Sequence, residues 1–147
     1  MAIDLEGLAQ SVRRPTLRMI HAEDPKDALR RSVGDLSGIE VMHNQILVAI
    51  YLRPEKTAGG VILSDVSRNE DRYQGKVGLV LKMGPLAFQD DARNDFKGQR
   101  VEVGDWIGYR VQDGWSLVVN GPEGKVDCRM LEDVHIKLRL DGPDEIY

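Results

Sequence analysis

The sequence contains a single cysteine, Cys128, and no long apolar run. One cysteine excludes a disulfide within the chain and fits a reducing, cytosolic setting. No apolar run approaches the roughly 20 residues that a membrane span needs. The N-terminus also lacks the charged-then-apolar order of a signal peptide. We therefore expect a cytoplasmic protein that is not inserted in a membrane.

The chain also lacks a large excess of charge of either sign. The chain has 20 basic and 24 acidic residues among its 147, a net charge of −4. Neither the first forty residues nor the remainder is basic, so a nucleic-acid surface has no electrostatic support. The length fits one domain of ordinary size plus an appendage.

Motifs of catalytic or metal chemistry are absent as well. The three histidines stand far apart, without a second ligand at metal-binding spacing, and are interpreted as surface or structural residues: His21, His43 and His135. Cys128 is expected to be a small buried apolar residue. The acidic pairs Asp90-Asp91 and Glu132-Asp133 are flanked by turn-like sequence and are expected at the solvated surface. The sequence therefore predicts no enzyme, no catalytic residue, no metal site and no cofactor.

Residues 1–40 are predicted to be helical or irregular. Two amphipathic patterns occur in this segment, one formed by Leu5, Leu8 and Val12 and the other by Leu29, Val33 and Leu36. Asp24 can cap the second helix and Pro25 suits its first position, while Gly34 and Gly38 frame its exit. The segment is too small to fold alone. It must lie on the main domain, bind a partner or remain loose.

From Val41 onward the pattern becomes that of strands. Ile46–Ile50 is a continuous apolar run, which is typical of a strand buried on both faces. Residues 77–82 predict a second strand, and the alternation from Val134 to Leu140 predicts a half-buried strand. Many short strands at regular spacing favour an all-β fold, a small barrel.

Turn signals separate these strands. Asp113-Gly114 predicts a hairpin between residues 106–111 and 115–119. Residues 120–124 form another turn cluster. The polar stretch 86–99 is expected to be an exposed hairpin or excursion.

One segment is unusual for a loop. The glycines Gly59 and Gly60, which make the backbone easy to bend, precede three consecutive aliphatic residues: Val61, Ile62 and Leu63. If exposed, this triplet needs a partner, so the segment is a candidate flexible docking arm. The other interpretation is that the triplet begins a strand buried in its own barrel.

Three segments around this loop resemble the GroES-type co-chaperonins. They are residues 45–50, residues 75–84 and the V-x-V-G-D strand entry within 101–107. The resemblance covers roughly Val41 to Leu140. It implies a GroES-like barrel over 41–140 with a flexible loop after the first strand, an N-terminal extension over 1–40 and a C-terminal tail over 141–147.

The resemblance also implies a function. Val61, Ile62 and Leu63 would insert between helices of the apical domains of a GroEL-type chaperonin ring, and Gly59 and Gly60 would correspond to the family's paired glycines. The copies would form a heptamer in which terminal strands join, about Ile46–Ile50 of one beside Val134–Leu140 of the next. The predicted function is therefore a co-chaperonin that caps a chaperonin ring and assists protein folding.

The forty-residue prefix and the tail depart from that family pattern. Extensions of this sort are common on viral structural proteins and on virus-encoded co-chaperonins. The alternative prediction is a virus capsid decoration or cement protein, located in the virion. In that role a GroES-like barrel would use residues 1–40 as a docking arm on a capsid protein.

Overall fold

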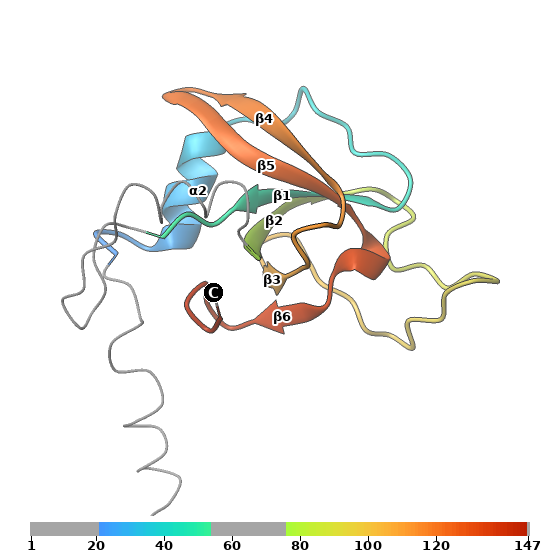
Figure 1. The fold of residues 1–147 in the computed structure, drawn as a ribbon. Helices are drawn as coiled ribbons and strands as arrows, with labels where there is room; N and C mark the ends of the chain where they lie inside the picture. Colours follow the sequence, from blue (N-terminus) through green and yellow to red (C-terminus); the bar gives the residue numbers. More distant parts are fainter. Residues whose placement is uncertain (1–20, 54–75, 147) are drawn as a thin grey trace, which may run out of the picture.

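The computed structural model describes residues 21–53 and 76–146. They form a six-stranded antiparallel sheet with one α-helix beside it (Figure 1). The elements, in chain order, are α2 (Pro25–Val33), β1 (Gln45–Ile50), β2 (Val77–Met83), β3 (Trp106–Gly108), β4 (Trp115–Gly121), β5 (Gly124–Glu132), the 3₁₀ helix η1 (Asp133–His135) and β6 (Leu138–Leu140). The predicted all-β fold class is confirmed. The helix predicted from Leu5, Leu8 and Val12 lies outside the described residues.

The first strand lies in the middle of the sheet, whose order is β4-β5-β1-β2-β3-β6. β1 pairs with β5 along one edge and with β2 along the other. Residues Ile46–Ile50 are all buried, as their continuous apolar run predicts. Because both edges of β1 are hydrogen-bonded within the chain, the expectation that this strand joins a neighbouring subunit is wrong.

The core lies on both faces of the sheet. We call one the helix-side face, and its buried residues include Leu47, Ala49, Leu79, Trp106 and Cys128. We call the other the loop-side face, and its buried residues include Ile46, Val48, Val80, Ile107 and Leu131. Segment 84–101 covers the loop-side face through Ala87 and Val101. Alternate residues of one strand thus pack into two different cores, one on each face of the sheet.

Helix α2 covers the helix-side face. Val33 is buried in this core, and Leu29 packs against it. Of the three possibilities for the prefix, residues 21–40 therefore take the first, because this part lies on the sheet of its own chain.

The ends of α2 follow local sequence signals. The Asp24 carboxylate accepts a hydrogen bond from the Lys26 backbone N at 2.9 Å, and Pro25 occupies the first turn. Gly34 ends the helix with φ of 67°, a conformation that glycine adopts without steric cost. The expectation that Leu36 shares the helical face is therefore wrong, although Leu36 still packs on the helix-side core.

The hairpin predicted around Asp113-Gly114 is not formed. β3 pairs with β2 and β6, whereas β4 pairs with β5. The turn itself exists, because the Asp113 backbone N donates to the Arg110 carbonyl oxygen at 3.1 Å. However, Gly114 lies against β5, so close that a Cβ would sit 2.1 Å from the Met130 carbonyl oxygen. The turn therefore delivers β4 to β5 instead of returning it to β3.

Two other turn predictions are confirmed. Gly121 pairs with Gly124 at the tip of the β4–β5 hairpin, within the predicted turn cluster 120–124. The V-G-D segment leads into β3, where Gly104 N donates to the Val80 carbonyl oxygen and Val80 N donates to that of Asp105. Segment 84–100 contains no strand and is mostly exposed, so it is the predicted excursion and not a hairpin.

The strand predicted over Val134–Leu140 is wrong in its first half. Residues 133–135 form η1, and only Leu138–Leu140 form β6. Leu138 is 46% exposed, so the expected half-buried alternation is not observed. His135, expected on the polar side of a strand, lies in η1, where its Nδ1 accepts a hydrogen bond from the Glu132 backbone N at 3.0 Å.

Candidate functional site

The predicted docking residues Gly59, Gly60, Val61, Ile62 and Leu63 lie outside the described residues, but the base from which their segment departs is described. Ile50, at the end of β1, pairs with Gly78 of β2. The next backbone N, that of Tyr51, donates to the Val77 carbonyl oxygen at 3.0 Å. Residues 54–75 therefore connect two neighbouring antiparallel strands, and both ends of the connection lie at one end of the sheet. We call residues 50–53 and 76–78 the loop base.

The loop base is tightly packed. A Cβ added to Gly78 would lie 2.1 Å from Val48 Cγ1 and 2.9 Å from the Ala49 carbonyl oxygen. Glycine is therefore the residue that allows β2 to approach β1 this closely. The loop base is therefore closely packed where it belongs to the sheet, at Gly78, whereas Leu52 and Lys76 are exposed.

A cavity of about 460 Å³ lies next to the loop base. Its walls come from the start of α2, from residues 50–52 and from residues 123–127 at the hairpin of β4 and β5. Leu29, Ile50 and Val126 line it together with charged residues of both signs: Glu23, Glu123, Asp127 and Lys125. It is thus a hollow of mixed apolar and charged lining, assembled from segments far apart in sequence.

A hydroxyl at the loop base joins both ends of the described chain. His21 Nε2 lies 2.7 Å from Tyr51 Oη, and Tyr51 Oη donates to Asp144 Oδ1 at 3.0 Å. The Tyr51 ring meets the ring of Trp106 edge to face at a centroid distance of 5.7 Å. The N-terminal segment, the end of β1 and the C-terminal tail therefore meet at one side chain.

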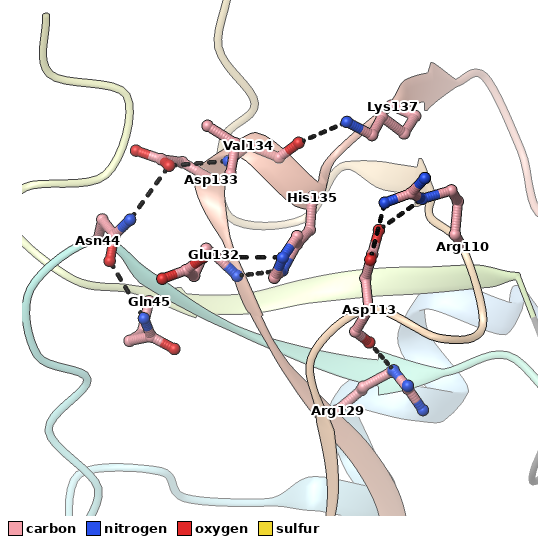
Figure 2. Close-up of polar contacts among 10 residues, drawn as sticks. All are labelled: Asn44, Gln45, Arg110, Asp113, Arg129, Glu132, Asp133, Val134, His135 and Lys137. Atoms are coloured by element: carbon pink, nitrogen blue, oxygen red, sulfur yellow. Dashed lines mark hydrogen bonds and ion pairs between the residues drawn. The ribbon is translucent and has the colours of Figure 1, made fainter. Parts of the chain in front are cut away.

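The acidic pair at the end of β5 has a structural role. Asp133 is 3% exposed and accepts hydrogen bonds from Asn44 Nδ2 and Val134 N (Figure 2). It accepts a third from Phe88 N. The prediction of a solvated surface site is wrong for Asp133, because this carboxylate holds three segments together. The same prediction is confirmed for Asp90 and Asp91, which are exposed and bind backbone N–H groups of their own loop.

A second polar cluster fixes the turn before β4. The buried Arg129 guanidinium donates from Nε to the Asp113 carbonyl oxygen at 2.7 Å (Figure 2). It also donates to the Val111 carbonyl oxygen and to Ser116 Oγ. The Asp113 carboxylate accepts two hydrogen bonds from Arg110, at 2.9 and 3.0 Å. These bonds from Arg110 lower the pKa of Asp113. Every charge in this cluster has a partner, so it stabilises the turn and offers no free acid or base.

Within the described residues, no group of three or more His, Cys, Asp and Glu side chains is placed to hold a metal ion. Cys128 is fully buried, as predicted, and burial raises the pKa of its thiol to about 12. In this part of the chain no helix is both long and apolar enough to cross a membrane.

Comparison with known proteins agrees with this architecture. No protein-family model matches the chain. A co-chaperonin GroES of Parvibaculum lavamentivorans is 37% identical over 83 residues, which cover 53% of this chain and 75% of the relative. The chain belongs to the GroES co-chaperonin family. GroES proteins of Hyphomonas neptunium and Dinoroseobacter shibae are 30% and 34% identical over 83 residues each, covering 82% and 77% of those relatives.

The sequence did not single out the contacts that this GroES-family chain makes around its loop base. The sequence marks His21 only as an ordinary surface or structural residue, and it carries no motif around Tyr51 or Asp144. Tyr51 follows an apolar strand directly, and a buried tyrosine hydroxyl usually needs a partner. That signal could have drawn attention to Tyr51, although no local pattern identifies its partners.

Proposed function

We propose that this chain is a co-chaperonin that binds a GroEL-type chaperonin ring in the cytoplasm through Val61, Ile62 and Leu63. Membership of the GroES family is the observation that carries the proposal. The loop base supports it, since residues 54–75 depart from a packed hairpin between β1 and β2. The sequence places Gly59 and Gly60 directly before the aliphatic triplet. The proposed role requires binding only and no catalytic residue.

The energetics favour many weak contacts acting together. Burying three aliphatic side chains contributes about 1.5–3 kcal/mol each. Ordering a flexible segment costs about 1–2 kcal/mol for each residue fixed. The two terms nearly cancel, so one copy alone is expected to bind weakly. Several copies held together increase the avidity by about 10²–10⁴.

The proposal therefore includes a ring of copies, a heptamer by analogy with the family. β1 has no free edge for the joint between subunits, because β2 and β5 occupy both sides. Among the described strands, β4 and β6 each pair on one side only, with β5 and β3 respectively. Both retain an edge for a neighbour, and β6 is the one that the analogy with the family's terminal strands assigns to the joint.

The decisive experiment uses Ile62→Asp and a chaperonin ring with nucleotide, with complex formation followed by the change in mass in solution. We expect the substitution to abolish capture while the sheet stays folded, because a carboxylate in an apolar groove is strongly disfavoured. Leu86→Asp is the matched control, since Leu86 is an exposed aliphatic residue outside the proposed arm. Undiminished capture by Ile62→Asp would refute the arm assignment.

The shell-protein alternative, with residues 1–40 as a docking arm, stays a prediction without added support. The three relatives named above are described as co-chaperonins. Helix α2, which belongs to the proposed docking arm, packs on the chain's own sheet.

A further inference from the structure

We propose that Tyr51 is a positioning residue that couples the N-terminal segment and the C-terminal tail to the loop base. The inference rests on the proposed function, because the loop base carries the segment proposed to bind the chaperonin. Its structural part, the coupling through one hydroxyl, concerns only described residues.

The hydrogen bonds have a definite direction. A tyrosine hydroxyl carries one proton, and Tyr51 Oη uses it toward Asp144 Oδ1 at 3.0 Å. His21 Nε2, at 2.7 Å from the same oxygen, is then the donor in the other bond. The chain of donors thus runs from the imidazole through the hydroxyl to the carboxylate. The hydrogen bonds in such a chain strengthen one another. Both bonds involve the Tyr51 hydroxyl, so removing this hydroxyl breaks both.

The place of Tyr51 explains why this coupling reaches the loop base. Its backbone N is bonded to the Val77 carbonyl oxygen, and its ring packs against Trp106 of β3. Tyr51 is 7% exposed as a residue, so most of its ring is shielded from water. Tyr51 is therefore fixed to β2 and β3 while its hydroxyl binds the segments around His21 and Asp144.

The segments around His21 and Asp144 are held by contacts with Tyr51, a residue distant from both in sequence. His21 is 30 residues from Tyr51 in sequence, and Asp144 is 93 residues away. These contacts reduce the freedom of the chain where it leaves β1 toward residues 54–75. A base that is ordered before binding lowers the entropy cost of binding a partner.

The test is a double-mutant cycle in the full chain, with urea unfolding as the first readout. His21→Leu should lower the folding equilibrium constant about threefold to tenfold in the wild-type background. In the Tyr51→Phe background the same change should have less than about a twofold effect, because its partner is already gone. His21→Gln should recover part of the loss, since its amide N–H can also donate.

Tyr109→Phe is the matched control. Tyr109 is as buried as Tyr51, at 5% exposed, but its hydroxyl oxygen has no hydrogen-bond partner among the described residues. Removing that hydroxyl breaks no bond, so Tyr109→Phe should leave the effect of His21→Leu unchanged. This separates loss of a particular hydroxyl from loss of any buried hydroxyl.

Capture of the chaperonin ring with nucleotide is the second readout. Tyr51→Phe should weaken capture about threefold to tenfold, and Tyr109→Phe should not. Additive effects of His21→Leu and Tyr51→Phe, or full capture by Tyr51→Phe, would overturn the inference. If the wild-type chain itself captures no chaperonin, the proposed function fails, and the cycle alone then decides whether the coupling exists.

Discussion

Lys82 Nζ on β2 donates a hydrogen bond to the carbonyl oxygen of Leu36 at 2.8 Å. It donates another to the carbonyl oxygen of Ile39. Lys82 pairs with Leu47 of β1 and so lies on the helix-side face. One ammonium group thus satisfies two carbonyl groups of the segment that links α2 to β1, and holds that segment on the sheet.

We expect Lys82→Met to lower the free energy of unfolding by about 1–3 kcal/mol, because the carbonyl groups of Leu36 and Ile39 lose their bonds to the ammonium group while the apolar stem is retained. The Leu36 carbonyl oxygen keeps its hydrogen bond from Ile39 N. Urea unfolding with an unchanged m-value would measure the effect. Lys125→Met is the control, since Lys125 is exposed on β5. Equal stability of the Lys82 variant and the wild type would show that the segment is held by its apolar contacts alone.

Asp133 supplies a second prediction. Asp133→Ala should destabilise the fold by about 2–4 kcal/mol, because Asn44 Nδ2, Phe88 N and Val134 N would each lose an acceptor. Asp133→Asn keeps one carbonyl oxygen and should cost less. Chemical denaturation of the two variants side by side checks this order. An alanine variant no less stable than the asparagine variant would contradict the role assigned to the carboxylate.

The third prediction concerns alkaline pH. Burial raises the pKa of Cys128 from 9.0 and that of Tyr109 from 10.0, each to about 12. The folded state therefore keeps protons that the unfolded state releases above pH of about 9. Stability should be constant with respect to these groups below that pH and should fall as pH rises toward about 12.

Tyr109→Phe isolates one part of this effect. The variant should lose stability less steeply between pH of about 10 and 12, since the unfolded chain has one fewer group to deprotonate. At pH 8 it should be at least as stable as the wild type, because the substitution removes a buried hydroxyl that has no partner in residues 21–53 and 76–146. Urea midpoints measured from pH 8 to 11 would show both effects. Parallel pH curves for the variant and the wild type would contradict the burial of a protonated Tyr109.

Local signals predicted much of the fold. Asp24, Pro25 and Gly34 mark the ends of α2 as capping rules require. The apolar run Ile46–Ile50 marks a strand buried on both faces, and residues 120–124 mark the β4–β5 hairpin. In each case the residues that carry the signal are also those that form the structure.

The failed predictions depend on distant side chains. Arg129 holds the turn at Asp113 from 16 residues away, and this contact helps to direct β4 onto β5. Asp133 accepts hydrogen bonds from Asn44 and Phe88, which are 89 and 45 residues away. These contacts hold the start of η1, which replaces the first half of the strand expected from alternation. Hydrophobic periodicity cannot register such contacts.

At the candidate site, too, the sequence predicts local features but not contacts between distant segments. The sequence identified Gly59, Gly60, Val61, Ile62 and Leu63 from composition and family resemblance, and their role stays a prediction. The meeting of His21, Tyr51 and Asp144 depends on tertiary packing of three separate segments. No spacing rule connects residues so far apart.

The position of α2 also bears on where a minimal folding unit begins. A recombinant fragment that started at Val41 would contain all the described strands but would lose the apolar residues of 21–40 that belong to the same core as Leu47 and Leu79, both fully buried in the intact chain. Uncovered aliphatic surface on a sheet promotes aggregation. The prefix that looks dispensable beside shorter relatives is therefore, from about residue 21 onward, as much a part of the hydrophobic core as the strands.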